Sequence, residues 1–240
     1  MRVLVSRAAL GSTRSKLRWE ATPAILAPMT ALAHVAPLRH LREPVPVDFP
    51  SEALVPETKE HLLLRTALFQ VLSNPLGDRA IIGSDQFVYW DASDARQGVA
   101  PDLFVKLGSP DETFDSWMVW KRGAPDFALE ILSESDAPRW TEKLPRYAAI
   151  GVDELVTYRL RDGALRVWDR LDGDLVERIV DGPSTPLRTL GIHLLLPRGA
   201  TTLAFAEDEE GTRPLLSRDA ARAARLRAKL VAAGIDPEGD

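Results

Sequence analysis

Regularly spaced apolar residues predict a helix that begins close to Thr58. Its inward-facing stripe follows the helical period and consists of Leu64, Ala67, Leu68, Val71 and Leu72. The Thr58 hydroxyl group is suited to cap the first turn. Asn74 and Pro75 are expected to end the helix, because the residue before a proline is disfavoured in the helical region.

The middle of the chain alternates between strand-like and helical patterns. β-Branched and aromatic residues over 79–91 and 99–108 predict two strands of a hairpin or meander, separated by a polar turn. Segment 126–133 predicts another strand, segment 141–151 a helix with Pro145 in its first turn, and segment 153–160 a further strand. This order of elements is typical of a mixed α/β sheet with helices beside it.

After residue 160 the sequence predicts further strands, followed by a basic helix near the C-terminal end. Asp172-Gly173 favours a tight hairpin between 164–170 and 174–180, and 192–197 is another apolar run. The final helix is predicted to start after Ser217 and to end at Gly234. It is amphipathic, and it could dock on the body, pair with a second copy or contact phosphates; docking or pairing is the outcome we expect.

The first fifty residues differ from the rest of the chain. They hold seven Lys and Arg against three Asp and Glu, and their apolar stretch is broken by Pro23, Pro28 and Pro37. Such prolines argue against a membrane helix. A secretory signal with small residues at 31–33 is the rival, but the long basic start and the prolines favour a basic, flexible arm over 1–44, or a natural start nearer Met29. We therefore expect a cytoplasmic protein without membrane contact, with a folded domain over 45–205 and a linker and basic helix over 206–240.

Composition excludes several kinds of chemistry. The 240 residues include no cysteine and four scattered histidines, so disulfide scaffolds and thiolate metal sites are excluded and a His-rich zinc site is disfavoured. Neither a phosphate-cradling glycine loop nor a nucleophile elbow occurs. The net charge is −5, and residues 51–240 hold 23 basic against 32 acidic residues, so any contact with nucleic acid must be local.

Two carboxylates stand in apolar surroundings. Glu130 interrupts the strand FALEIL, both faces of which are expected to be buried, and Asp102 follows Pro101 at the head of an apolar strand. If the two strands are neighbours, the acids lie side by side, and like charges that close need a cation or a shared proton. Carboxylate oxygens suit Mg²⁺ or Mn²⁺, and the nearest cation along the chain is Lys143.

Each candidate also has an ordinary structural interpretation. A salt bridge to Lys143 or Arg146 would account for Glu130, and Asp102 could simply be a turn residue. Glu60 would be a favourable charge near a helix start. Asp126 also follows a proline, but it lies only four residues before Glu130 on the same strand.

The ordered set Asp102, Glu130 and Lys143 resembles the PD-(D/E)XK nuclease superfamily. The segments PDLFV, LEILSESD and EKLPRYAAIGVDEL, together with Thr58 and His61 at the head of the first helix, are similar to the Uma-type restriction endonuclease family over about residues 45–197. The resemblance implies a restriction-endonuclease-like core, with a central mixed β-sheet flanked by α-helices. It also implies a DNA endonuclease that depends on Mg²⁺ or Mn²⁺.

The resemblance further implies a role for each site residue. Asp102, Glu130 and the carbonyl group of Ile131 would hold the metal. Lys143 would orient the attacking water or stabilise charge on phosphorus. Glu60, which is expected on the inward side of its helix one turn before Leu64, would add a carboxylate. His61 would contact the substrate or fix a neighbouring residue, and Arg139 would contact the substrate.

This sequence departs from the superfamily pattern at two positions. The usual lysine position, two residues after the glutamate, is Leu132, so Lys143 is expected to reach in from the following helix. Arg139 stands where relatives often carry an acid.

A catalytically silent interaction module that retains the nuclease fold is the alternative hypothesis. A nuclease predicts that basic residues surround the acid pair, namely Arg65, Lys106, Lys121, Arg122, Arg139 and Arg146. Hydrolysis of a smaller phosphate compound would instead need a closed pocket. A homodimer is compatible with each hypothesis.

Overall fold

The computed structural model describes residues 57–109, 111–133, 140–196 and 202–237. All of them belong to one compact unit that spans 45–240. The predictions made for the arm over 1–44 and for Arg139 lie outside the described residues. No helix in the described part of the chain has the length and apolar character needed to cross a bilayer.

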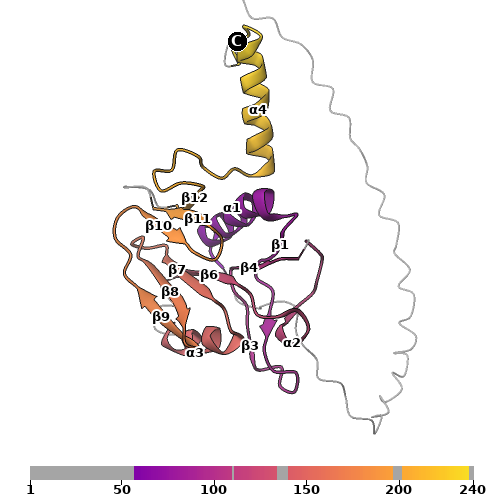
Figure 1. Cartoon of the computed structure of the whole chain (residues 1–240), viewed down its shortest axis with the longest axis vertical. Helices are drawn as coiled ribbons and strands as arrows, with labels where there is room; N and C mark the ends of the chain where they lie inside the picture. Colours follow the sequence, from indigo (N-terminus) through magenta and orange to yellow (C-terminus); the bar gives the residue numbers. More distant parts are fainter. Residues whose placement is uncertain (1–56, 110, 134–139, 197–201, 238–240) are drawn as a thin grey trace, which may run out of the picture. The chain divides into compact units, whose positions relative to one another are not determined.

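A six-stranded mixed sheet forms the centre of this unit (Figure 1). In spatial order its strands are β1 (Ala80–Gly83), β4 (Leu103–Leu107), β6 (Phe127–Leu132), β7 (Glu154–Arg159), β8 (Leu165–Leu171) and β9 (Asp174–Arg178). Strands β6 and β7 are parallel, and every other neighbouring pair in this sheet is antiparallel. The predicted α/β class with a mixed sheet is therefore confirmed.

Helices cover both faces of this sheet (Figure 1). On one face, α1 (Lys59–Leu76) packs Leu64, Leu68, Leu72 and Leu76 against the core. On the other face, α3 (Trp140–Ile150) contributes Trp140, Tyr147 and Ile150, and this helix is also the crossover between β6 and β7. Because both faces are covered, all six residues of β6 are buried, as its apolar run predicts.

Two small sheets and two further helices complete the described structure. One sheet contains β10 (Ser184–Leu187), β11 (Ile192–Leu195) and β12 (Ala204–Ala206) and packs into the α1 side of the core. The other contains β3 (Gly98–Val99), β2 (Val88–Tyr89) and β5 (Trp117–Met118), on the α3 side. The helices are α2 (Val119–Arg122) and α4 (Arg218–Ala232).

Helix α1 starts as predicted but differs in its end and in its inward face. The Thr58 side chain accepts a hydrogen bond from the His61 amide, which confirms the cap. The helix continues through Pro75 to Leu76, because a proline in the last turn removes a single backbone bond. The buried row repeats every four residues and leaves Ala67 exposed.

Two other local predictions need correction. Pro145 is the sixth residue of α3 and not part of its first turn; the Thr141 carbonyl that loses a partner belongs to an exposed residue, which water can solvate. Strands β1 and β4 do pair, but the segment between them leaves the sheet to form β2 and β3. Asp85 lies there with a left-handed φ of 62°, which breaks the strand direction.

The predicted hairpin turn and the predicted ends of the last helix are confirmed. Asp172 and Gly173 have φ values of 51° and 95°, the pattern of the two-residue hairpin turn that joins β8 and β9. Helix α4 is capped by Ser217, whose side chain accepts from the Ala220 amide at 3.3 Å. At its other end Gly234 has a φ of 74°, which glycine adopts without strain.

Candidate functional site

Asp102 and Glu130 lie side by side where β4 and β6 pair. The register places Leu103 opposite Leu129, so the residue before β4 stands opposite the next residue of β6. Asp102 is 6% exposed and Glu130 is 3% exposed. Burial of two adjacent carboxylates is costly unless protons, cations or hydrogen-bond donors compensate for it.

Asp102 is fixed by three neighbours from different elements. The Ile131 amide of β6 donates to Asp102 Oδ2 at 2.6 Å, and His61 Nε2 of α1 lies 2.8 Å from Asp102 Oδ1. The backbone carbonyl of Asp102 accepts from Ser84 Oγ at 2.9 Å. Burial lowers the pKa of His61, but the hydrogen bond and charge of Asp102 and the charge of Glu57 outweigh it, so the net pKa is raised. The same contact would offset the charge of Asp102 whenever His61 is protonated.

Glu130 is contacted from α3 on the opposite side of the sheet. The Tyr147 hydroxyl group donates to Glu130 Oε1, and Lys143 Nζ lies 3.4 Å from the same oxygen. Burial and the charge of Asp102 raise the pKa of Glu130 to about 8, against a smaller lowering by Lys143 and Tyr147. Without a further cation, Glu130 holds a proton at neutral pH.

A second layer of charges supports the α1 side of the site. The Arg65 guanidinium contacts Glu57 at 2.6 Å and Ser84 Oγ at 3.2 Å, and it lies 3.6 Å from Asp85. His61 Nδ1 lies 3.4 Å from Glu57. These contacts fix the side chains that hold Asp102, so the site is supported from α1 as well as from α3.

The structure brings together four of the predicted site residues: Asp102, Glu130, Lys143 and His61. In an extended strand the N–H and C=O of one residue point to the same side, so the Ile131 carbonyl faces the Asp102 side of β6. Glu60 lies in the first turn of α1 but is exposed, which corrects the expectation that it faces inward. Glu60 lies in the turn before Leu64, the first buried leucine of this helix.

Tyr147 and Ser84 also contact the acid pair, in addition to the site residues that the sequence predicts. For Tyr147 the sequence holds a usable signal, since Lys143 and Tyr147 are four residues apart on a helix and therefore share a face. Ser84 gives no such signal, because its contact depends on how the loop after β1 returns to Pro101.

The basic residues expected around the acid pair are scattered in the described structure. Arg65 is near Asp102, whose charge acts on it. By contrast, Lys106 pairs with Asp126 at 3.1 Å, and Arg146 donates to the Gly98 carbonyl at 3.2 Å. The expected ring of cations is therefore not found among the described residues, because position along the chain does not fix which face of the sheet a side chain serves.

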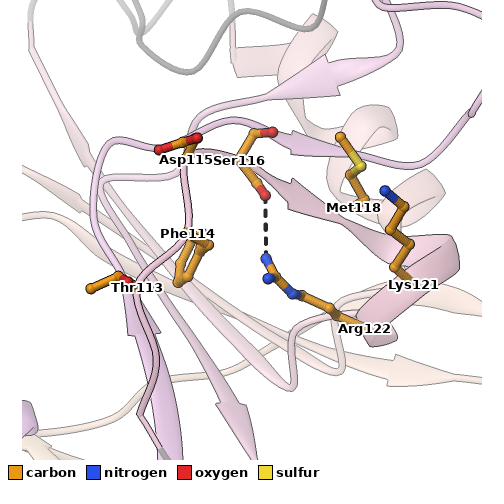
Figure 2. Close-up of a pocket in the computed structure, with 7 residues that line it drawn as sticks. All are labelled: Thr113, Phe114, Asp115, Ser116, Met118, Lys121 and Arg122. Atoms are coloured by element: carbon orange, nitrogen blue, oxygen red, sulfur yellow. Dashed lines mark hydrogen bonds between the residues drawn. The ribbon is translucent and has the colours of Figure 1, made fainter.

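Lys121 and Arg122 line a separate pocket of about 330 Å³, together with Thr113, Phe114, Asp115, Ser116 and Met118 (Figure 2). The Arg122 guanidinium lies over the Phe114 and Trp117 rings and donates to the Ser116 carbonyl at 3.4 Å. The acid pair does not line this pocket. This pocket is therefore not the closed pocket at the acid pair that hydrolysis of a small phosphate compound would need.

The donor set at the acid pair fits a hard divalent cation. Asp102, Glu130 and the Ile131 carbonyl offer only oxygen, which Mg²⁺ and Mn²⁺ prefer. A cation would also offset the burial and the repulsion by Asp102 that together raise the pKa of Glu130. Within the described ranges no group of three or more His, Cys, Asp or Glu side chains is arranged to hold a metal. Any cation here would depend on the two carboxylates, the carbonyl group and water.

Comparisons with known proteins give two findings. The model of the Uma2 family, described as "Putative restriction endonuclease", matches residues 51–204. A crystal structure of "a putative nuclease belonging to DUF820" from Anabaena variabilis is similar at 16% sequence identity and a TM-score of 0.47, covering 58% of this chain and 79% of that chain. A search of curated proteins finds no match.

Proposed function

The chain belongs to the Uma2 family, and from this premise we propose that it is a DNA endonuclease that depends on a divalent cation and uses Asp102, Glu130 and Lys143. The observation that supports this most strongly is the pair of adjacent carboxylates on neighbouring strands, whose burial and proximity raise the pKa of Glu130. A perturbed carboxylate beside a lysine is typical of a functional site.

Asp102, Glu130 and the Ile131 carbonyl would hold Mg²⁺ or Mn²⁺. When bound, such an ion makes a coordinated water more acidic and polarises a phosphodiester. The chain's own contribution is orientation: the Ile131 amide and His61 fix Asp102, and Tyr147 fixes Glu130.

In this proposal the Lys143 ammonium group contacts the substrate. Its side chain is 32% exposed while its ammonium group stays 3.4 Å from Glu130, so it can meet solvent and the buried acid at once. An ammonium group in that position stabilises negative charge that develops on phosphorus. His61 would assist by holding Asp102, and Glu60 and Arg139 remain proposed contributors.

A catalytically silent module is the second candidate function, and two observations favour it. The described basic residues do not surround the acid pair, and each acid already has partners within the chain: His61 contacts Asp102, and Lys143 and Tyr147 contact Glu130, which holds a proton at neutral pH. Such an arrangement satisfies the two carboxylates without metal or substrate.

Cleavage of supercoiled plasmid DNA with Mg²⁺ or Mn²⁺ distinguishes the two candidates. We expect nicking by the wild type and a loss of at least about 100-fold in Glu130→Gln and Asp102→Asn, since each removes one ligand charge. Asp126→Asn is the matched control, because Asp126 also follows a proline and is bound to Lys106 and the Leu107 amide, away from the pair. It should cleave like the wild type.

Circular dichroism should show that all three variants stay folded. Full activity in folded Glu130→Gln or Asp102→Asn would discard the site. A wild type that leaves the plasmid intact with both ions would establish the silent module.

A further inference from the structure

Four basic residues of α4 form a straight stripe along the helix. Arg218, Arg222, Arg225 and Lys229 are spaced by four, three and four residues, which places them on one face. All four are exposed, and the stripe extends for about 16 Å along the helix axis. Figure 1 labels this helix near the C-terminal end of the chain.

Helix α4 forms through its own local signals. It buries none of its fifteen residues, and it is defined by the Ser217 cap and by the turn at Gly234. Its single acid, Asp219, lies in the first turn, where the helix dipole favours negative charge. The residue before the cap, Leu216, accepts a hydrogen bond from Asn74 at 2.9 Å, which ties the start of α4 to the end of α1.

The stripe differs in charge from the rest of the domain. Within 51–240 the chain has 23 basic and 32 acidic residues, yet α4 has five basic residues against one acid. The acid pair, where the proposed cleavage occurs, has few cations of its own among the described residues. A nuclease that binds a polyanion needs positive charge elsewhere.

We propose that α4 is a DNA-contacting element whose stripe binds the phosphodiester backbone away from the acid pair. The proposal rests on the proposed nuclease function, because that function supplies the DNA. Charge complementarity supports it: a row of exposed guanidinium and ammonium groups fits the regularly repeated phosphates of a duplex. Such contacts position DNA without reading its sequence.

A second copy of α4 fits the same surface less well. Leu226 and Leu230 would form the apolar seam of a helix pair, but the stripe lies directly beside them on the helix. Pairing two copies along this seam would bring the two basic rows close together, and like charges at such a border destabilise the pair. The stripe therefore favours an anionic ligand over a self-complementary one.

Salt-dependent binding to a labelled 30-base-pair duplex tests the proposal in the full chain. Fluorescence anisotropy in EDTA separates binding from cleavage. Each lost phosphate contact should reduce the slope of log Kobs against log salt by about 0.9. We expect this reduction for Arg225→Gln, and about twice as much for the double variant Arg222→Gln, Arg225→Gln.

Arg227→Gln is the matched control, because it removes the same charge two residues further along the same helix but from its opposite face. It should leave the slope unchanged. Equal slopes for Arg225→Gln and Arg227→Gln, or no binding by the wild type, would overturn the proposal. So would a dimer in analytical ultracentrifugation that Leu226→Gln dissociates while the salt slope stays the same.

The outcome is separable from that of the nuclease proposal. If the plasmid stays intact but the slopes differ as expected, α4 binds DNA and only the cleavage proposal fails. If the wild type nicks DNA and Glu130→Gln does not, while Arg225→Gln keeps the wild-type slope, only the role of α4 fails.

Discussion

Glu130 is the residue of the acid pair whose pKa is strongly raised by its surroundings. Its carboxyl group is buried on a fully covered strand, adjacent to Asp102, and both conditions disfavour its charge. Lys143 and Tyr147 offset only part of that penalty. Glu130 therefore needs a proton or a cation, and which of the two it holds depends on pH and on the ions present.

The pH dependence of stability should reveal the proton on Glu130. Its pKa is about 8 in the fold and 4.5 ordinarily, so between these values the folded state binds a proton that the unfolded chain has released. The free energy of unfolding should thus fall as pH rises through this window, by at most about 1.4 kcal/mol per pH unit, and level off above it. Glu130→Gln cannot ionise and should lack this component.

Urea denaturation in EDTA at several values between pH 5 and 8.5 measures both proteins. The stability of Glu130→Gln relative to the wild type should increase steadily across the series. Curves that run parallel would show that Glu130 keeps an ordinary pKa in the fold.

For single residues, the sequence predicts which side chains are buried in a strand, but it does not predict which side chains they contact. A carboxylate inside the apolar run FALEIL is visible in the sequence, because strand alternation makes its burial predictable. The contacts of Asp102 with His61 and with the Ile131 amide join three distant segments, so no local pattern specifies them.

Helix α3 delivers both groups that contact Glu130. Lys143 and Tyr147 are one turn apart, and the crossover from β6 to β7 places their shared face over the strand. In the proposed site, Lys143 takes the place of a lysine on the strand itself, where Leu132 belongs to the core that includes Trp140 and Tyr147. A helix can supply the charge without opening that core.

Substitution of Lys143 by methionine tests this assignment. Methionine keeps the apolar stem but removes the ammonium group, so we expect DNA cleavage to fall by about 100-fold. Lys143 is not one of the proposed metal ligands, so the affinity for Mn²⁺ should change little. Calorimetry at pH 8.5 and plasmid cleavage measure the two quantities.

Lys121→Met provides the control, because Lys121 is an exposed lysine that lines the separate pocket. It should cleave at the wild-type rate. A parallel loss of cleavage and of Mn²⁺ affinity in Lys143→Met would mean that the lysine only holds Glu130 in place.

Element types were predictable here and element boundaries less so. Apolar periodicity located α1, α3 and the strand β6, and Asp172-Gly173 located a hairpin. The separate sheet of β2, β3 and β5 was missed, because its strands are only two residues long and their pairing depends on the chain's return after Asp85.

For the whole molecule, the distribution of charge constrains function most. The domain is acidic, and the described cations near the acid pair are paired with individual acids rather than arranged as a ring. Polyanion binding therefore depends on local features, and among the described residues the basic stripe of α4 is the one we propose for it. Net charge was legible from composition, whereas the scattering of Lys106 and Arg146 was not, since folding decides which acid or carbonyl each side chain meets.

The central claim is that a divalent cation makes two adjacent buried carboxylates tolerable at the acid pair. Calorimetric titration of the wild type with Mn²⁺ at pH 8.5 tests it most directly, with Glu130→Gln and the control Asp126→Asn alongside. We predict one binding site in the wild type and in Asp126→Asn, and none in Glu130→Gln. A wild type that shows no Mn²⁺ binding, or a Glu130→Gln variant that binds it equally well, would contradict the account.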